Sequence, residues 1–165
     1  MLPPLTETAV EDLLTAGPVA RGRLEWAVRG GHLRSRLPIA NDRGESLELD
    51  FHISLDVPWK YTLQLMWAKR PIKRLDVRGS HVNHCDGSNT TWRFQTHKQP
   101  FKDRYDLGQA YTPGDIPDTN GTVVAPGEYQ AVFQAFLAEC GIRDDCVWVE
   151  PRVPAAQLST RQGPR

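Results

Sequence analysis

An alternation of apolar and polar side chains over residues 46–57 places the strongest constraint on this chain. Six apolar residues occupy every second position, and Ser, Glu, Asp or His fill the positions between them. The apolar set is Leu47, Leu49, Phe51, Ile53, Leu55 and Val57. A period of two is typical of a β-strand with one buried face and one solvated face. The segment therefore predicts a strand of an antiparallel sheet that leaves one face open to water.

The same period recurs in shorter segments along the chain. These segments are 24–28, 33–39, 61–67, 75–77 and 92–94. Together with residues 46–57 they predict a mainly antiparallel sheet of about six strands in a meander. A short further strand is expected at residues 147–149.

Two segments show the period of a helix instead. Thr8 and Glu11 have the spacing of a capping box and predict the start of a short N-terminal helix. Over residues 127–140 apolar side chains recur three and four positions apart, and Gly141 is a typical helix stop. We therefore expect an α+β fold in which one long C-terminal helix packs on one face of the sheet.

Length and composition predict one domain in a reducing compartment. The chain has 165 residues; residues 1–152 are expected to form the domain, and residues 153–165 a flexible tail. The start lacks the features of a secretion signal, and no apolar run is long enough to span a membrane. Three cysteines are too few for a disulfide framework, which favours a cytoplasmic location.

The charged residues are unevenly distributed, although the formal net charge is zero. Residues 60–105 carry ten Lys and Arg against three Asp, so this segment is +7 and the remainder is −7. A basic segment of this kind predicts binding to nucleic acid, with RNA favoured over DNA. The alternative is a protein-binding module, such as an antitoxin or inhibitor without catalytic activity. Its divided charge would serve a protein partner or a homodimer.

A candidate site follows if residues 73–78 and 92–97 are neighbouring antiparallel strands. Alternation then places Leu75, Val77, Trp92 and Phe94 in the core. The basic side chains Arg74, Arg78 and Arg93 would lie on the opposite face, where they could hold phosphate groups.

Two histidines accompany these arginines and suggest a cleavage chemistry. His97 would share the basic face, and His81 lies in the loop at its end. As acid and base they could cleave RNA by 2′-OH attack, without metal or cofactor, as a toxin-like endoribonuclease does. Lys98 would add a phosphate contact. Tyr111, in a long loop rich in turn residues, could stack on a base.

Other interpretations of the same residues remain open. His81, His84, Cys85 and His97 could bind a metal, but we expect none because adjacent His84 and Cys85 converge poorly on one ion. The basic side chains could instead form a solvated face that is paired with acidic residues elsewhere, with the polar loop residues serving only turns. His32 and His52 are interpreted as surface imidazoles.

Several short motifs follow one another in the C-terminal half. They are R-x-D-x-x-G, H-x-N with a nearby D-G, T-H-K, A-Y-x-P-x-D-I, and an F-x-x-F helix ending at Cys-Gly. They fall on Arg74, Asp76, Gly79, His81, Asn83, Asp86, Gly87, Thr96, His97, Lys98, Ala110, Tyr111, Pro113, Asp115, Ile116, Phe133, Phe136 and Cys140. This half resembles a group of small uncharacterised bacterial proteins associated with toxin–antitoxin and phage-defence neighbourhoods. The resemblance implies a role in toxin–antitoxin or phage-defence systems, but it does not identify any catalytic residues.

Overall fold

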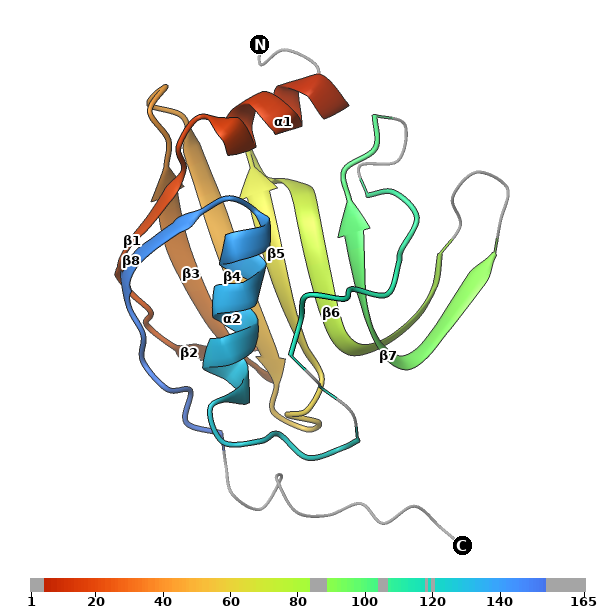
Figure 1. Cartoon of the computed structure of the whole chain (residues 1–165). Coiled ribbons are helices and arrows are strands. Elements are labelled where there is room, and N and C mark those ends of the chain that lie inside the picture. Colours follow the sequence, from red (N-terminus) through yellow and green to blue (C-terminus); the bar gives the residue numbers. More distant parts are fainter. Residues whose placement is uncertain (1–4, 84–88, 104–106, 118, 120, 154–165) are drawn as a thin grey trace, which may run out of the picture.

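The computed structural model describes residues 5–83, 89–103, 107–117, 119 and 121–153 (Figure 1). Its elements are α1 (Glu7–Thr15), β1 (Val19–Arg23), β2 (Ala27–Arg29), β3 (His32–Ala40), β4 (Ser46–Ser54), β5 (Tyr61–Trp67), β6 (Arg70–Asn83), β7 (Thr90–Pro100), α2 (Glu128–Glu139) and β8 (Arg143–Val147). The strands form one sheet in the order β7-β6-β5-β4-β3-β1-β8, and β2 pairs with β3. Neighbouring strands are antiparallel except β1 and β8, which are parallel, so the sheet is mixed.

The predicted fold class is wrong. Within the described residues the protein is mostly β, with eight strands in a mixed sheet and two short helices of nine and twelve residues. The predicted long C-terminal helix is absent there. Twelve residues make a helix of about 18 Å, about three-fifths of the roughly 29 Å width of a sheet seven strands across. A short strand is present near the predicted 147–149, but it is β8 at Arg143–Val147.

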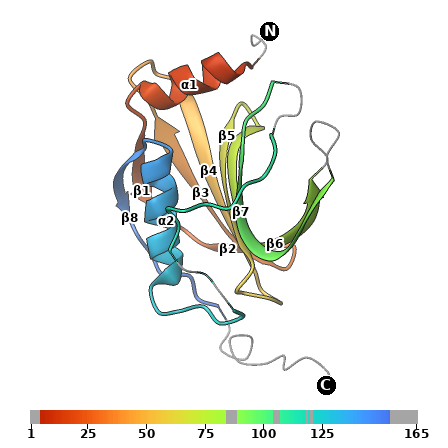
Figure 2. The same ribbon diagram turned by 45° about the vertical axis from the view of Figure 1, so that its right-hand side comes forward.

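The core lies between the sheet and α2, which Figures 1 and 2 show on one side of it. The apolar positions of β4 are buried, as the alternation predicted, and Phe51 is at their centre. Phe51 stacks on Phe133 of α2 at a ring-centroid distance of 6.4 Å and meets Trp26 edge-on at 5.2 Å. Since the apolar positions of β4 face α2, its polar positions form the opposite face of the sheet.

The N-terminal helix begins two residues earlier than its capping-box pattern predicts. Thr6 is the N-cap, and its hydroxyl accepts a hydrogen bond from the Ala9 N–H at 3.1 Å. The residue before the cap, Leu5, and the fourth helical residue, Val10, are both buried. This apolar pair has the spacing of a hydrophobic staple, which favours Thr6 over Thr8 as the cap.

The hairpin of β6 and β7 bends sharply and curls away from the rest of the sheet (Figure 2). Its register shifts where Asp76 pairs with His97 but Gly79 pairs with Gln95. Extra residues at this point take the left-handed conformation: Arg78 has φ +50° and Phe94 has φ +52°. Such bulges bend a strand and interrupt its alternation. The predicted core position of Phe94 is therefore wrong, because its side chain is 61% exposed.

Gly79 permits the close approach of side chains at this bend. A Cβ atom at this position would lie 2.8 Å from Asp76 Cβ and 2.8 Å from His97 Cε1. Neither atom is the far end of a flexible chain, so only glycine fits here without displacement of the network around Asp76.

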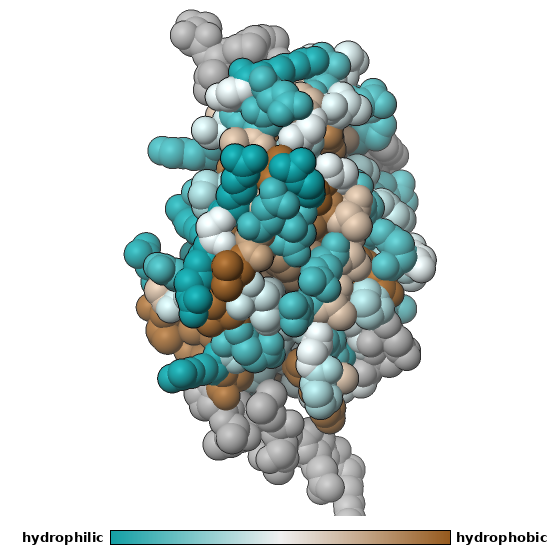
Figure 3. All heavy atoms as spheres, turned by 60° about the vertical axis from the view of Figure 1, so that its left-hand side comes forward, coloured by the Kyte–Doolittle hydropathy of each residue, from teal (hydrophilic) through white to brown (hydrophobic). Residues whose placement is uncertain are grey.

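The surface beside β1 and β8 is mainly hydrophilic. Figure 3 brings the left-hand side of Figure 1 forward and shows hydrophobic groups in separate small areas between hydrophilic ones. Isolated exposed apolar side chains are ordinary on a protein surface. Among the helices of the described residues, none has both the length and the apolar character needed to cross a membrane. Of the predicted tail, only Val153 lies within the described residues.

Candidate nucleic-acid interface

The sheet face opposite α2 carries polar side chains that the strand register aligns in rows. In one row, Arg34 is opposite His52, His52 is opposite Thr62, and Thr62 is opposite Asp76. The next row contains Arg36, Asp50, Gln64 and Arg74. We call the side chains of these two rows, together with His32 and Ser54, the polar face. Because residues two apart on a strand share a face, both rows follow from the alternation of β3, β4, β5 and β6.

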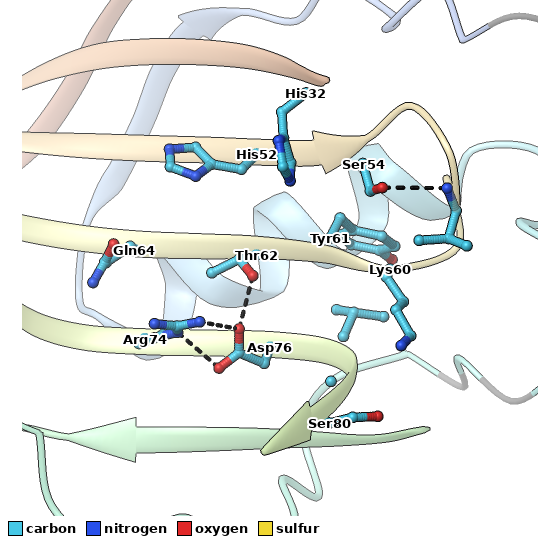
Figure 4. Close-up of a pocket in the computed structure, with 13 residues that line it drawn as sticks. His32, His52, Ser54, Lys60, Tyr61, Thr62, Gln64, Arg74, Asp76 and Ser80 are labelled. Atoms are coloured by element: carbon cyan, nitrogen blue, oxygen red, sulfur yellow. Dashed lines mark hydrogen bonds and ion pairs between the residues drawn. The ribbon is translucent and has the colours of Figure 1, made fainter. Parts of the chain in front are cut away.

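The polar face is hollowed next to the bent hairpin. The hollow has a volume of about 520 Å³. It lies between strands β3–β5 with the first part of β6 on one side, and the part of β6 that begins at Gly79 on the other. Figure 4 shows the labelled side chains that line it, among them His32, His52, Lys60, Gln64, Arg74 and Ser80. The bend at Gly79 brings Ser80 to the rim, so the concave shape depends on the two bulges of the hairpin.

Asp76 is the most strongly held group of this hollow. Arg74 donates to both of its carboxylate oxygens, at 2.7 and 2.9 Å, and the Thr62 hydroxyl donates at 2.7 Å. Burial alone would raise the pKa of Asp76, but hydrogen bonds from His97, Arg74 and Thr62 hold it well below its usual range. Asp76 is therefore a carboxylate at neutral pH and offsets much of the charge of Arg74.

Of the histidine side chains that the structure describes, His32 and His52 line the hollow (Figure 4). Burial lowers the pKa of His52 and the nearby charge of Arg34 lowers it further, although Asp50 opposes the shift. The imidazole of His52 is thus neutral at neutral pH. His32 Nδ1 lies 2.9 Å from the Gly30 carbonyl oxygen.

The sequence interpretation treated His32 and His52 as surface imidazoles and did not predict that both line the hollow. A signal was present in the sequence, because the turn residues between β3 and β4 include Asn41, Asp42 and Gly44. Locating that turn sets the register and places Arg34 opposite His52.

Of the predicted acid–base pair, the structure describes only the His97 side chain, which does not line the hollow. His97 is 0% exposed, its Nε2 is 3.5 Å from Asp76 Oδ2, and its Nδ1 is 2.8 Å from the Gln95 carbonyl oxygen. Its ring stacks on Trp92 at 4.7 Å. The backbone of His81, in β6, pairs with that of Trp92 in β7, and the His81 side chain lies outside the described residues.

The metal alternative falls largely outside the described residues, because His84 and Cys85 belong to the segment 84–88. Within the described residues, no group of three or more His, Cys, Asp or Glu side chains is placed to hold a metal ion.

Arg78 forms a buried ion pair instead of facing the hollow. It is 2% exposed, and its Nη1 and Nη2 donate to Glu128 at 2.7 and 3.1 Å. It also donates to the carbonyl oxygens of Trp59 and Val123. The left-handed backbone of Arg78 turns its side chain toward α2, so Arg78 ties β6 to the start of this helix.

Lys98 and Tyr111 form a second link between the sheet and α2. Lys98 is buried, and its Nζ lies 2.6 Å from both Asp115 Oδ1 and Glu139 Oε2. Tyr111 pairs with Lys98 through the backbone, and its hydroxyl donates to Glu139 at 3.3 Å. The alternative interpretation is thus correct in pairing Arg78 and Lys98 with distant acidic residues, but wrong in placing these two side chains on a solvated face. Of the five predicted nucleic-acid contacts, Arg74 lines the hollow, and Arg93 is exposed on β7.

An aromatic pair with a lysine stands next to the hollow, and we call it the aromatic rim. The rings of Trp59 and Phe94 are 5.8 Å apart. Lys60 Nζ lies 4.4 Å from the centre of the Phe94 ring and 5.3 Å from that of Trp59. Since Lys60 also lines the hollow, it joins the aromatic rim to the polar face.

Comparison of the chain with family models, curated proteins and solved structures gives no match in any of the three.

Proposed function

We propose that the protein binds single-stranded RNA along the hollow of the polar face. The observation that carries the proposal is the combination of this hollow with the aromatic rim at its edge. Proteins that bind single strands combine a basic groove for the backbone with aromatic rings on which bases stack. Lys60 supplies the charge at the junction of the two and makes no ion pair with the described residues.

Polar groups of the hollow favour RNA as the bound strand. Ser54, Thr62, Gln64 and Ser80 offer hydroxyl and amide groups within reach of a bound chain. A 2′-hydroxyl group both donates and accepts hydrogen bonds, and it distinguishes RNA from DNA at such a site.

The proposal concerns binding and not cleavage, because His97 is fully buried and its two ring nitrogens face Asp76 and Gln95.

The proposed RNA binding also implies a location in the cytoplasm, where both RNA and reduced thiols are found. The free thiols of Cys140 and Cys146 fit such a compartment.

Substitution of Lys60 by Gln tests the proposal. The variant loses one cation at the hollow, so the slope of log affinity against log salt should be smaller by about 0.7. Affinity at low salt should be several-fold lower. Both are measured by fluorescence anisotropy with a labelled single-stranded RNA of about 12 nucleotides, within the usual range of roughly 4–16 per site.

The matched control is Lys69→Gln, which removes the same charge from an exposed position between β5 and β6. Its affinity and salt slope should equal those of the parent. Absence of RNA binding by the parent protein at low salt would refute the proposal, as would identical salt slopes for the two variants.

A further inference from the structure

Phe94 has a backbone conformation that its side chain does not explain. Its φ of +52° is strained for a bulky residue and is ordinarily taken by glycine or asparagine. Strain of this kind persists where burial of the side chain offsets it, yet the Phe94 ring is 61% exposed. The ring therefore contributes little to the core, and glycine would satisfy the bulge better.

Phe94 lines a second cavity of about 290 Å³, between β7 and a loop that contributes residues 112, 113, 116, 117 and 119. Ile116, Pro113 and Pro117 supply apolar walls. Polar atoms come from Gln95 and from the hydroxyls of Thr96 and Thr119, which lie 2.6 Å from one another. A flat apolar surface combined with a few polar groups is the usual composition of a site for a small ring ligand.

We propose that this cavity is a binding site for one unpaired nucleobase, which stacks on Phe94. The inference rests on the proposed function, since the base belongs to the RNA strand in the hollow. Lys60 links the two cavities: it lines the hollow and lies 4.4 Å from the Phe94 ring. A phosphate held by Lys60 would thus place its own base beside Phe94. The Gln95 amide and the threonine hydroxyls would face the edge of the base.

The test compares Phe94→Gly and Phe94→Asn with Phe94→Tyr. Glycine and asparagine accept the left-handed backbone but remove the ring, whereas tyrosine keeps it. RNA affinity should fall about 5- to 150-fold in the Gly and Asn variants, the range expected for loss of one stacked base. The Tyr variant should bind like the parent. Thermal unfolding should show the Gly and Asn variants at least as stable as the parent, because the strain is relieved.

A second arm uses RNA strands in which single bases are removed while the backbone stays intact. Removal of one base should weaken binding to the parent and leave binding to Phe94→Gly unchanged. Equal affinity of the parent, Gly and Asn variants would overturn the nucleobase site while the RNA-binding function stood. A clear loss of stability in both variants, with binding unchanged, would assign the ring to packing. Absence of RNA binding by the parent would overturn both proposals.

Discussion

Substitution of Glu128 by Ala is expected to lower the free energy of unfolding by about 3–5 kcal/mol, the usual effect of removing one partner from a buried ion pair. Glu128 accepts hydrogen bonds from Arg78 at 2.7 and 3.1 Å, from the Tyr61 hydroxyl at 2.7 Å and from the Ala125 N–H at 3.1 Å. Without the carboxylate, the Arg78 guanidinium is left buried with its charge uncompensated. Urea unfolding followed by tryptophan fluorescence measures the loss.

Two further variants separate the ion pair from general effects on helices. Glu11→Ala, at an exposed position of α1, should change stability by no more than about 0.5 kcal/mol. The double variant Arg78→Met with Glu128→Leu should recover part of the loss, since apolar replacement of both partners removes the unpaired charge. A loss below about 1 kcal/mol in Glu128→Ala would contradict the importance of this pair.

Asp76→Asn is expected to lower the free energy of unfolding at neutral pH by about 3 kcal/mol. The carboxylate accepts hydrogen bonds from Arg74 and Thr62, and a neutral amide cannot replace it opposite a guanidinium. Because the folded-state pKa of Asp76 lies below the unfolded value, the carboxylate stabilises the fold above about pH 4. That contribution is lost as the pH falls through the acid range toward the folded-state pKa.

The difference in unfolding free energy between Asp76→Asn and the parent should therefore stay constant from about pH 7 to about pH 5 and narrow as the pH falls below about 4. Urea unfolding at several pH values measures it. Asp56→Asn, an exposed carboxylate in the turn after β4, should differ from the parent by less than about 0.5 kcal/mol. A difference between Asp76→Asn and the parent that stays constant with pH would show that the Asp76 carboxylate is not selectively stabilised in the folded state.

The parts of the fold that follow a local period could be predicted, and those set by distant partners could not. β4 has a clear alternation, and its apolar side is buried as expected. β1 and β8 have no such period, because most of their side chains are exposed. The bulges at Arg78 and Phe94 leave no clear mark in the sequence, since neither residue favours a positive φ.

The same distinction applies to the candidate site. Arg74 was placed on the open face by alternation and does line the hollow. Arg78 was placed there by the same pattern, but the bulge and the distant Glu128 move it to the core. Local spacing contains no information about a carboxylate fifty residues away in sequence.

The parallel pairing of β1 with β8 joins segments far apart in the chain, with Val19 opposite Arg143 and Arg23 opposite Val147. During synthesis the edge of β1 therefore has no partner until nearly all of the domain has left the ribosome. Closing so long a loop is slow compared with forming hairpins, and an unpaired strand edge favours association with other chains. The β3–β6 meander can form early, whereas completion of the sheet must wait for residues 143–147.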